Sequence, residues 1–366
     1  MGVISFARGV PAPECLPVSE LADCARAAIE RDGASVLSYG PGGGYAPLRE
    51  WIAARHGVEP SRVVITSGSL QGFVFLVEQL VKPGSRVLVE APTYDRPLKI
   101  LNRLGAEIVG LPMDDDGLQV DALERTLAAG EKPAFLYTIA TFQNPSGRTL
   151  STERRRRIAE LAREHELLVL EDDPYGLVRY EGEAPPTIFE LEGGTNVAYA
   201  SSFSKTIAPG VRVGYFVLPP ALAAQIEALA VSTYISPPFL TQAAVYEFVS
   251  RGLFEPNLER VTGLLGARRD AMLAALEEHM PEGATWSRPE GGYFIWLDLP
   301  HEAGDLLARA EAARVTFVQG TDFFADGSGT RSLRLAFSFV SVDEIAEGVS
   351  RLAGLLRGAP APASTL

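Results

Sequence analysis

The stretch SSFSKTIAPGVRVGY, residues 201–215, follows a short apolar run and contains the most distinctive lysine of the chain. Lys205 stands among serines that include Ser202 and Ser204, and Arg212 follows seven residues later. Small hydroxyls and an arginine can bind a phosphate dianion, and the arginine can lower the pKa of the lysine. The stretch therefore predicts a phosphate site beside a nucleophilic lysine. The other lysines fit turns or a polar helix face: Lys82, Lys99 and Lys132.

Seven short apolar runs alternate with longer amphipathic stretches over residues 40–250. Runs of this length are typical of strands that are buried on both faces, and the amphipathic stretches between them are typical of helices. The alternation predicts mostly parallel pairing with right-handed crossovers. We therefore expect an α/β fold with a large, doubly wound, seven-stranded sheet. Its expected strands are Val63–Thr66, Arg86–Glu90, Glu107–Leu111, Ala134–Thr138, Leu167–Glu171, Val197–Ala200 and Val211–Leu218.

The pattern changes after Phe254, where a long helix precedes shorter strands with glycine turns. This change predicts a smaller α+β domain. We expect a large domain over residues 34–253 and a small domain that combines an N-terminal arm, 1–33, with residues 254–356. Residues 357–366 are expected to form a disordered tail. The elements expected after Phe254 are the helix Glu255–Glu278, the strands Ala284–Trp286, Tyr293–Asp298, Val315–Val318 and Ser332–Phe337, and the helix Val342–Leu356.

Three further motifs follow expected strands. Asp172 of EDDPYG ends one strand, and a carboxylate there can keep a pyridine nitrogen protonated. Asn144 of QNPSG can donate to a phenolic oxygen. Taken alone, each also fits a simple turn before proline. In TSGSLQG, the residues Gly68, Ser69 and Leu70 open a helix, where free backbone N–H groups bind phosphate.

Together these motifs resemble the fold-type I aminotransferases of class I/II, which depend on pyridoxal 5′-phosphate (PLP). The closest resemblance is to the subgroup of 2-aminoadipate and kynurenine aminotransferases. It runs nearly end to end, from ISFARGVPAPECLP to SLRLAFSF. The resemblance implies an enzyme that moves an amino group between an L-amino acid and a 2-oxo acid. The large domain would then be the PLP-binding domain.

The resemblance also implies a role for each site residue. Lys205 would hold PLP as a Schiff base and act as the catalytic base, Asp172 would pair with the pyridinium nitrogen, and Tyr94 would stack on the ring. The ring's phenolic oxygen would be bonded by Asn144 and Tyr175, and the phosphate would be held by Ser69, Ser202, Ser204 and Arg212. In a homodimer, Tyr39 would reach the phosphate of the neighbouring subunit. The substrate carboxylate would be bound by Arg334, helped by Asn144 and the backbone of Gly9.

Four departures separate the chain from the usual pattern of the subgroup. The N-terminal arm is shorter, Leu70 replaces a frequent glutamine, and Ala140 replaces a proline. Arg8 replaces a small glycine beside the expected substrate site. A guanidinium there can pair with a distal carboxylate, as in glutamate, 2-aminoadipate or 2-oxoglutarate. Alternatively, Arg8 points to solvent, as surface arginines do.

Three other functions stay open at this point. The same scaffold supports other PLP reactions, such as β-elimination, decarboxylation or oxidation, because fold does not fix outcome. Consumption of a 2-oxo acid in step with amino-acid loss would distinguish transamination from them. One class of transcription regulators carries a similar domain behind a winged helix, whereas here the similarity begins at residue 3. A catalytically dead scaffold is disfavoured because Lys205, Asp172, Asn144 and Arg334 are all present.

Composition narrows the remaining classes. The net charge of −13 disfavours nucleic acid and anionic membranes as partners. The two cysteines form no CxxC pair, no signal peptide or membrane span is evident, and a cytoplasmic location is expected. The four histidines are scattered, so no metal site is expected. The basic cluster Arg154–Arg157 is expected to be a solvated helix face.

Overall fold

The sheet expected between residues 63 and 218 is present in the computed structural model, which describes residues 2–130 and 132–357. Its strands are β2 (Val63–Thr66), β3 (Arg86–Ala91), β4 (Glu107–Asp114), β5 (Gly117–Leu118), β6 (Phe135–Thr138), β7 (Val169–Asp172), β8 (Val197–Ser202) and β9 (Gly214–Val217). In space the order is β2-β9-β8-β7-β6-β3-β4-β5. Parallel pairs join β4, β3, β6, β7 and β8, as the strand–helix alternation predicted.

The sheet has eight strands where the sequence predicted seven. The additional strand, β5, has two residues and pairs antiparallel with the end of β4, so it is too short to leave a periodic signal. The strand expected from Val211 begins instead at Gly214. Pro209–Val211 form a 3-10 turn (η3), and Arg212 has a left-handed φ of 50° that ends this turn. β9 then runs antiparallel to both β8 and β2.

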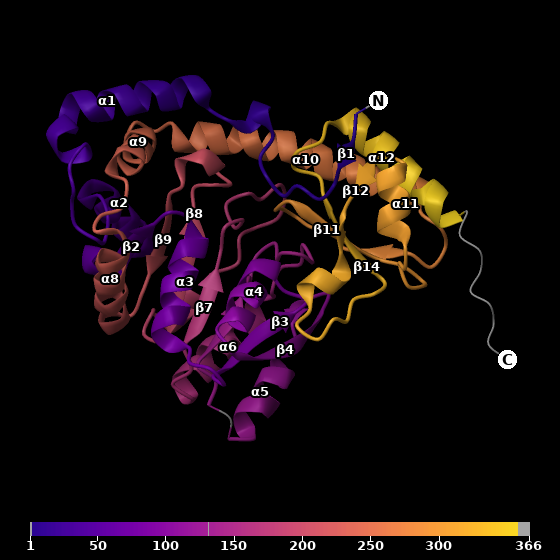
Figure 1. Cartoon of the computed structure of the whole chain (residues 1–366), viewed down its shortest axis with the longest axis horizontal. Coiled ribbons are helices and arrows are strands. Elements are labelled where there is room, and N and C mark those ends of the chain that lie inside the picture. The colour runs from indigo at the N-terminus through magenta and orange to yellow at the C-terminus, as the bar shows by residue number, and fades with distance from the viewer. Residues whose placement is uncertain (1, 131, 358–366) are drawn as a thin grey trace.

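Helices cover both faces of the sheet (Figure 1). On one face lie α2 (Ala46–His56), α5 (Val120–Ala128), α6 (Thr152–Glu164), α7 (Ile188–Glu192) and α9 (Phe239–Ser250), and α1 (Val18–Val36) packs on α9. On the other lie α3 (Ser69–Leu80), α4 (Asp95–Arg103) and α8 (Pro220–Tyr234). Alternate strand residues enter the two cores: Leu88 and Leu136 face α6, whereas Val89 and Tyr137 face α3. A short 3-10 helix, η2 (Pro60–Arg62), precedes β2.

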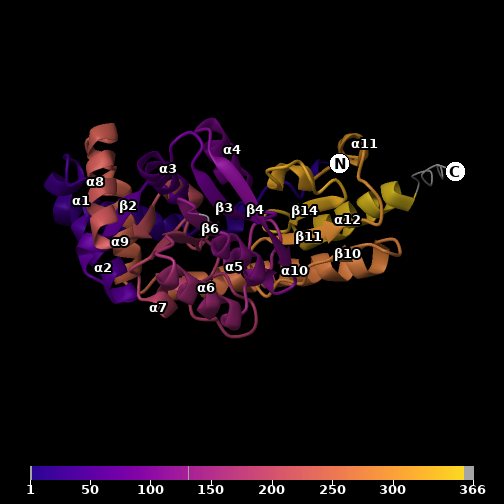
Figure 2. The same cartoon turned by 90° about the horizontal axis from the view of Figure 1, so that it is seen from below.

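The C-terminal part builds a second, smaller sheet beside the first, as Figure 2 shows in orange and yellow. It contains β10 (Thr285–Trp286), β11 (Phe294–Asp298), β13 (Val318–Gln319) and β14 (Ser332–Ala336), in the antiparallel order β10-β11-β14-β13. The helices are α10 (Phe254–His279), which reaches it from the large sheet, α11 (Leu306–Ala312) and α12 (Val342–Arg357). η4 (Gly320–Phe323) leads from β13 toward β14.

The single strand expected at Val315–Val318 is divided in two. Its first half, β12 (Val315–Thr316), pairs in parallel with β1 (Ile4–Ser5), and its second half is β13. The division follows from two different partners, which local periodicity does not reveal. After β1 the chain crosses toward the large sheet through η1 (Pro13–Cys15). Residues 4–15 are called the N-terminal strap below.

The proposed division at residues 33 and 253 stays a proposal. Cys24 and Ala28 of α1 lie in the core of the large sheet, which favours a large domain that begins nearer residue 18. Arg357, the first residue of the expected tail, is the last residue of α12, and residues 358–366 lie outside the described part. Within residues 2–130 and 132–357, no helix combines the length and the apolar character needed to cross a membrane.

Candidate active site

The carboxyl ends of β6, β7 and β8 meet at one edge of the large sheet, where ligands bind in α/β folds. A hollow of about 200 Å³ lies there. Its lining contains most of the residues that the sequence singled out, although they come from five separate segments. The lining residues are Gly68, Ser69, Leu70, Tyr94, Ile139, Asn144, Asp172, Pro174, Tyr175, Ser202, Ser204, Lys205, Pro209 and Arg212.

Lys205 follows β8 and presents its amine to this hollow. Its Nζ donates to the carbonyl oxygen of Gly9 in the N-terminal strap, at 2.8 Å. Burial, assisted by the positive charges of Arg334 and Arg212, lowers the pKa of Lys205 to about 8. A much larger fraction of this amine is therefore neutral near pH 7 than for an exposed lysine, and the neutral amine is the nucleophilic form.

Asp172 ends β7 and is buried. Its Oδ2 accepts a hydrogen bond from the Tyr137 hydroxyl at 2.8 Å, whereas its Oδ1 is buried without a partner among the described residues. Burial raises the pKa of Asp172 to about 7. A buried carboxylate oxygen without a donor is costly. A protonated ring nitrogen would supply the missing donor and, as a cation, would lower this pKa again.

The hydroxyls and the arginine expected around the phosphate lie together. Ser202 Oγ donates to Ser204 Oγ at 2.8 Å, and Arg212 Nη1 lies 3.4 Å from Ser204 Oγ. Gly68 precedes α3 with a φ of 88°, and a Cβ there would lie 2.3 Å from Arg212 Nη2. The positive φ favours glycine at this position, and a larger residue would displace the guanidinium from the start of α3. The free N–H groups at the start of α3 complete an anion site.

Arg334, in β14 of the small sheet, meets Asn144 from the large sheet. Arg334 Nη1 donates to Asn144 Oδ1 at 2.9 Å, and Nη2 donates to the Ala7 carbonyl at 3.0 Å. The guanidinium lies 4.3 Å and 5.0 Å from the ring centres of Phe294 and Phe323. Stacked between two rings and 7 % exposed, it is oriented before any ligand arrives.

Two tyrosines close the hollow. Tyr94 stands at the start of α4, and burial raises its pKa to about 12. Tyr175 packs against Tyr293, with ring centres 5.3 Å apart, and burial raises its pKa as well. Because both pKa values are raised, both phenols stay protonated at neutral pH, and each can donate a hydrogen bond. Lys205 Nζ lies 5.6 Å from the Tyr175 ring centre.

The profile of the family described as "Aminotransferase class I and II" matches residues 4–352. The chain belongs to this family. Aromatic-amino-acid aminotransferase 1 of Thermococcus litoralis is 37% identical over 97% of the chain and 88% of its own length. Kynurenine aminotransferase of Pyrococcus horikoshii superposes with a TM-score of 0.94 at 37% identity, covering 98% of this chain and 91% of the other.

A third relative bears on the cofactor. The α-aminoadipate aminotransferase LysN of Thermus thermophilus, solved with N-(5′-phosphopyridoxyl)-L-leucine, superposes with a TM-score of 0.93 at 38% identity and covers 98% and 92% of the two chains. The cofactor of this aminotransferase is PLP. The residues present fit it, since Asp172 offers an unpartnered oxygen and Gly68, Ser204 and Arg212 form an anion cradle. The enzyme moves an amino group between an amino acid and a 2-oxo acid.

Four of the expected residues do not line the hollow through their side chains. Arg334 meets it only through its hydrogen bond to Asn144. Gly9 meets it only through the carbonyl that accepts from Lys205. Tyr39 is 82% exposed. Arg8 is exposed, and its guanidinium lies 4.3 Å from the ring centre of Phe339. Tyr39 and Arg8 therefore remain predictions that this subunit does not test.

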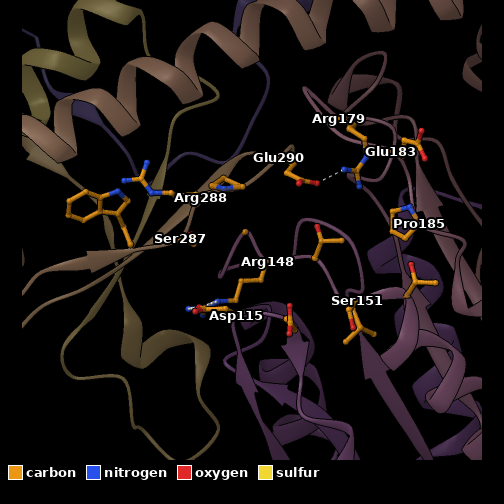
Figure 3. A pocket seen from close by; sticks show the side chains of 16 residues that line it. Asp115, Arg148, Ser151, Arg179, Glu183, Pro185, Ser287, Arg288 and Glu290 are labelled. Atoms are coloured by element: carbon orange, nitrogen blue, oxygen red, sulfur yellow. Dashed lines mark hydrogen bonds and ion pairs between the residues drawn. The ribbon is translucent and has the colours of Figure 1, made fainter.

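A second hollow of the aminotransferase, about 540 Å³, lies between the start of α6 and the β10–β11 turn (Figure 3). Figure 3 shows two ion pairs among its charged side chains. Arg148 binds Asp115 at 2.8 Å, and Arg179 binds Glu290 at 2.8 Å. None of the residues expected to bind the cofactor or the substrate lines this second hollow.

The expectation of a solvated basic face at Arg154–Arg157 is wrong for Arg155. Its side chain is fully buried and donates to the carbonyls of Ala140 and Leu150 and to the Thr141 hydroxyl, at 2.6, 2.9 and 2.8 Å. Four successive arginines point to different sides of a helix, so one of them must turn inward toward the sheet. Arg154 and Arg157 are half-buried and form ion pairs with Asp114 and Glu124, and Arg156 is exposed as expected.

Proposed function

We propose that the hollow lined by Lys205 is the active site and that Lys205 binds PLP covalently. When bound, PLP supplies an electron sink for the negative charge that develops at the substrate α-carbon. The observation that carries the proposal is the joint presence of a lysine with a lowered pKa and a buried carboxylate oxygen without a donor, Asp172 Oδ1. Perturbed groups of this kind cluster at functional sites.

The residues around the hollow then have the following roles. Lys205 holds the cofactor and moves the proton at the substrate α-carbon. Asp172, itself held by Tyr137, keeps the ring nitrogen protonated. Tyr94 packs on the ring face and excludes water. The ring oxygen is bonded by Asn144 and Tyr175, and the phosphate by Gly68, Ser69, Leu70, Ser202, Ser204 and Arg212.

Arg334 binds the substrate carboxylate in this proposal. Its two stacking rings, Phe294 and Phe323, fix the guanidinium plane, and Asn144 already engages one of its nitrogens. A bidentate pair with a carboxylate orients the α-proton for removal. The Gly9 backbone closes the site from the strap side, where its carbonyl holds Lys205.

The reaction is tested with a panel of amino acids offered together with 2-oxoglutarate or pyruvate. Transamination requires that one 2-oxo acid is consumed for each amino acid lost, and that a new amino acid appears. Loss of the amino acid without consumption of the 2-oxo acid would contradict the proposal and indicate elimination or decarboxylation.

We also propose that Arg8 binds the substrate, and the same panel of amino acids tests this role. Its exposed position beside Phe339 limits a bond with a distal carboxylate to about 1 kcal/mol, the range of exposed ion pairs. We therefore expect Arg8→Ala to reduce kcat/KM for a dicarboxylic donor by up to about five-fold and to leave a neutral donor of similar size unchanged. An equal change on both donors would show that Arg8 has only a surface role.

We further propose that the enzyme is a homodimer with shared active sites. Beside Tyr39 lie the exposed apolar side chains of Leu37, Val231 and Ile235. Gly40 N donates to Ser236 Oγ at 3.0 Å, so the two segments that carry them are in contact. An apolar patch of this kind favours burial against a second copy. The two buried free thiols are in keeping with the proposed cytoplasmic location.

Subunit exchange tests the role of Tyr39. A Lys205→Ala chain and a Tyr39→Ala chain are each expected to be impaired. If Tyr39 serves the partner's site, a mixed dimer has one intact site, so an equal mixture regains about a quarter of the wild-type activity. An equal mixture that stays as inactive as its components would show that Tyr39 serves its own subunit.

A further inference from the structure

A buried carboxylate, Glu90, lies at the end of β3 beside the active site without lining it. Its Oε1 accepts from the Thr138 hydroxyl at 2.6 Å, and its Oε2 accepts from the Ile139 N–H at 3.2 Å and from Gln143 Nε2 at 2.9 Å. Thr138 ends β6, and Ile139 is the first residue of the loop that follows it. Glu90 therefore joins the end of one strand to the loop that follows the next strand of the sheet.

The side chain of Gln143 is bonded not only to Glu90 but also to two backbone groups. Its Nε2 also donates to the Pro92 carbonyl at 2.8 Å, and its Oε1 accepts from the Ser146 N–H at 2.8 Å. Every side-chain bonding group of Gln143 has a protein partner, and the residue is 1% exposed. Pro92 lies two residues before Tyr94, and Gln143 directly precedes Asn144, so one amide links the segments of two site residues.

Arg155 holds the same loop from the other side. Its nitrogens bind the carbonyls of Ala140 and Leu150, which are the two ends of the segment that contains Asn144. The loop is thus fixed at both ends by Arg155 and in its middle by Gln143. Buried polar networks of this kind are rigid when every member is satisfied, and costly when one member is lost.

We propose that Gln143, held by Glu90, is a positioning residue that sets the orientation of the Asn144 amide. With the backbone fixed, Asn144 Oδ1 takes the Arg334 N–H, which leaves the Nδ2 hydrogens for the cofactor's ring oxygen. The inference rests on the proposed role of Asn144 and adds the residues that aim it. Neither Glu90 nor Gln143 lines the hollow, so both act only through the loop.

The two residues respond differently to conservative changes. In Glu90→Gln, the new amide oxygen can accept from Ile139 N and Gln143 Nε2, and its nitrogen can donate to the Thr138 hydroxyl, which is able to accept. The shape and the bonding partners are kept, while the bond with Thr138 reverses direction and the side chain can no longer ionise. Gln143→Met keeps the length of the side chain and removes all three of its hydrogen bonds.

The test is a pH titration of the visible absorption of the holoenzyme, together with thermal unfolding. A hydrogen bond donated to the ring oxygen stabilises its ionised form, so losing that bond raises the titration midpoint. We expect Asn144→Ala to raise the midpoint, and Gln143→Met to raise it by about half a pH unit to one unit, the equivalent of one neutral hydrogen bond. Gln143→Asn, which retains the amide, gives a smaller shift in the same direction.

Two controls separate positioning from general destabilisation. Glu192→Gln alters a buried carboxylate that accepts from Thr195 N and Asn196 N, far along the chain from this loop, so it lowers the unfolding temperature but keeps the midpoint. The titration midpoint of Glu90→Gln is expected to stay close to the wild-type value. In the double variant Gln143→Met/Asn144→Ala, the midpoint equals that of Asn144→Ala alone, because both changes act through one amide.

The inference is overturned if Gln143→Met and Gln143→Asn lower the unfolding temperature and leave the midpoint at its wild-type value. Additive shifts in the double variant also overturn it, since they would show that Gln143 acts independently of Asn144. Failure of the proposed function looks different, because the wild-type protein itself would then show no visible band that titrates.

Discussion

Replacement of Lys205 with alanine is expected to reduce kcat by roughly 10⁴-fold or more, because one side chain both links the cofactor and moves the substrate proton. The cofactor is still expected to bind, since Ser204 and Arg212 and the start of α3 are unchanged. Borohydride treatment of the wild-type holoenzyme should fix the cofactor to the peptide that contains Lys205. Steady-state kinetics and peptide mapping measure the two effects.

Lys99 provides the matched control. It is an exposed lysine that forms an ion pair with Asp95 at 2.7 Å, so Lys99→Ala should keep wild-type kcat and wild-type labelling. Borohydride labelling of Lys82, Lys99 or Lys132 instead of Lys205 would contradict the assignment. The pKa of about 8 adds a pH signature: covalent attachment of PLP to the cofactor-free protein should speed up as the pH rises toward 8, well below the range of an exposed lysine.

Replacement of Asp172 with asparagine is expected to lower kcat by about 10²–10³-fold, the usual cost of one preorganised electrostatic group. The amide matches the carboxylate in shape but has no charge to keep the ring nitrogen protonated. That charge matters most after the α-proton has left, so cofactor and substrate affinity should change much less than kcat. Kinetics at saturating substrate measure the loss in kcat, and a titration of cofactor binding measures the change in affinity.

The neighbouring Asp173 shows whether the effect is specific. Its Oδ2 accepts from the Tyr199 hydroxyl and its Oδ1 from the Gly176 N–H, both at 2.8 Å, so neither oxygen needs a ligand. Asp173→Asn should lower the unfolding temperature and reduce kcat by less than about ten-fold. A wild-type kcat in Asp172→Asn, or an equal loss in both variants, would remove the special role of Asp172.

The sequence predicted the large sheet well because its strands are continuous apolar runs between amphipathic helices. The hollow could be predicted for the same reason: Asp172 and Lys205 stand just after such runs, and parallel strands bring their carboxyl ends to one edge. The resemblance to a known family supplied Arg334, which lies far along the chain and meets the hollow only through Asn144.

The supporting residues could not be predicted in the same way. Tyr137 looks like any aromatic strand residue until β6 is placed beside β7. Arg155 looks like a surface charge until α6 is rotated onto the loop at Ala140. Glu90 ends an apolar run, where a carboxylate usually reaches solvent. In each case the hydrogen-bond partner comes from another segment, so neither propensity nor periodicity contains the information.

The pairing of β1 with β12 has a consequence for how the protein is made. Ile4 lies opposite Val315, so the first strand leaves the ribosome about 310 residues before its partner exists. At about 5–20 residues per second, that delay lasts roughly 15–60 s. Throughout it, Ile4 and Phe6, both buried in the finished fold, have no core to enter. Nascent chains of this enzyme should therefore depend on chaperones at their N-terminal end, and gain activity only at the close of translation.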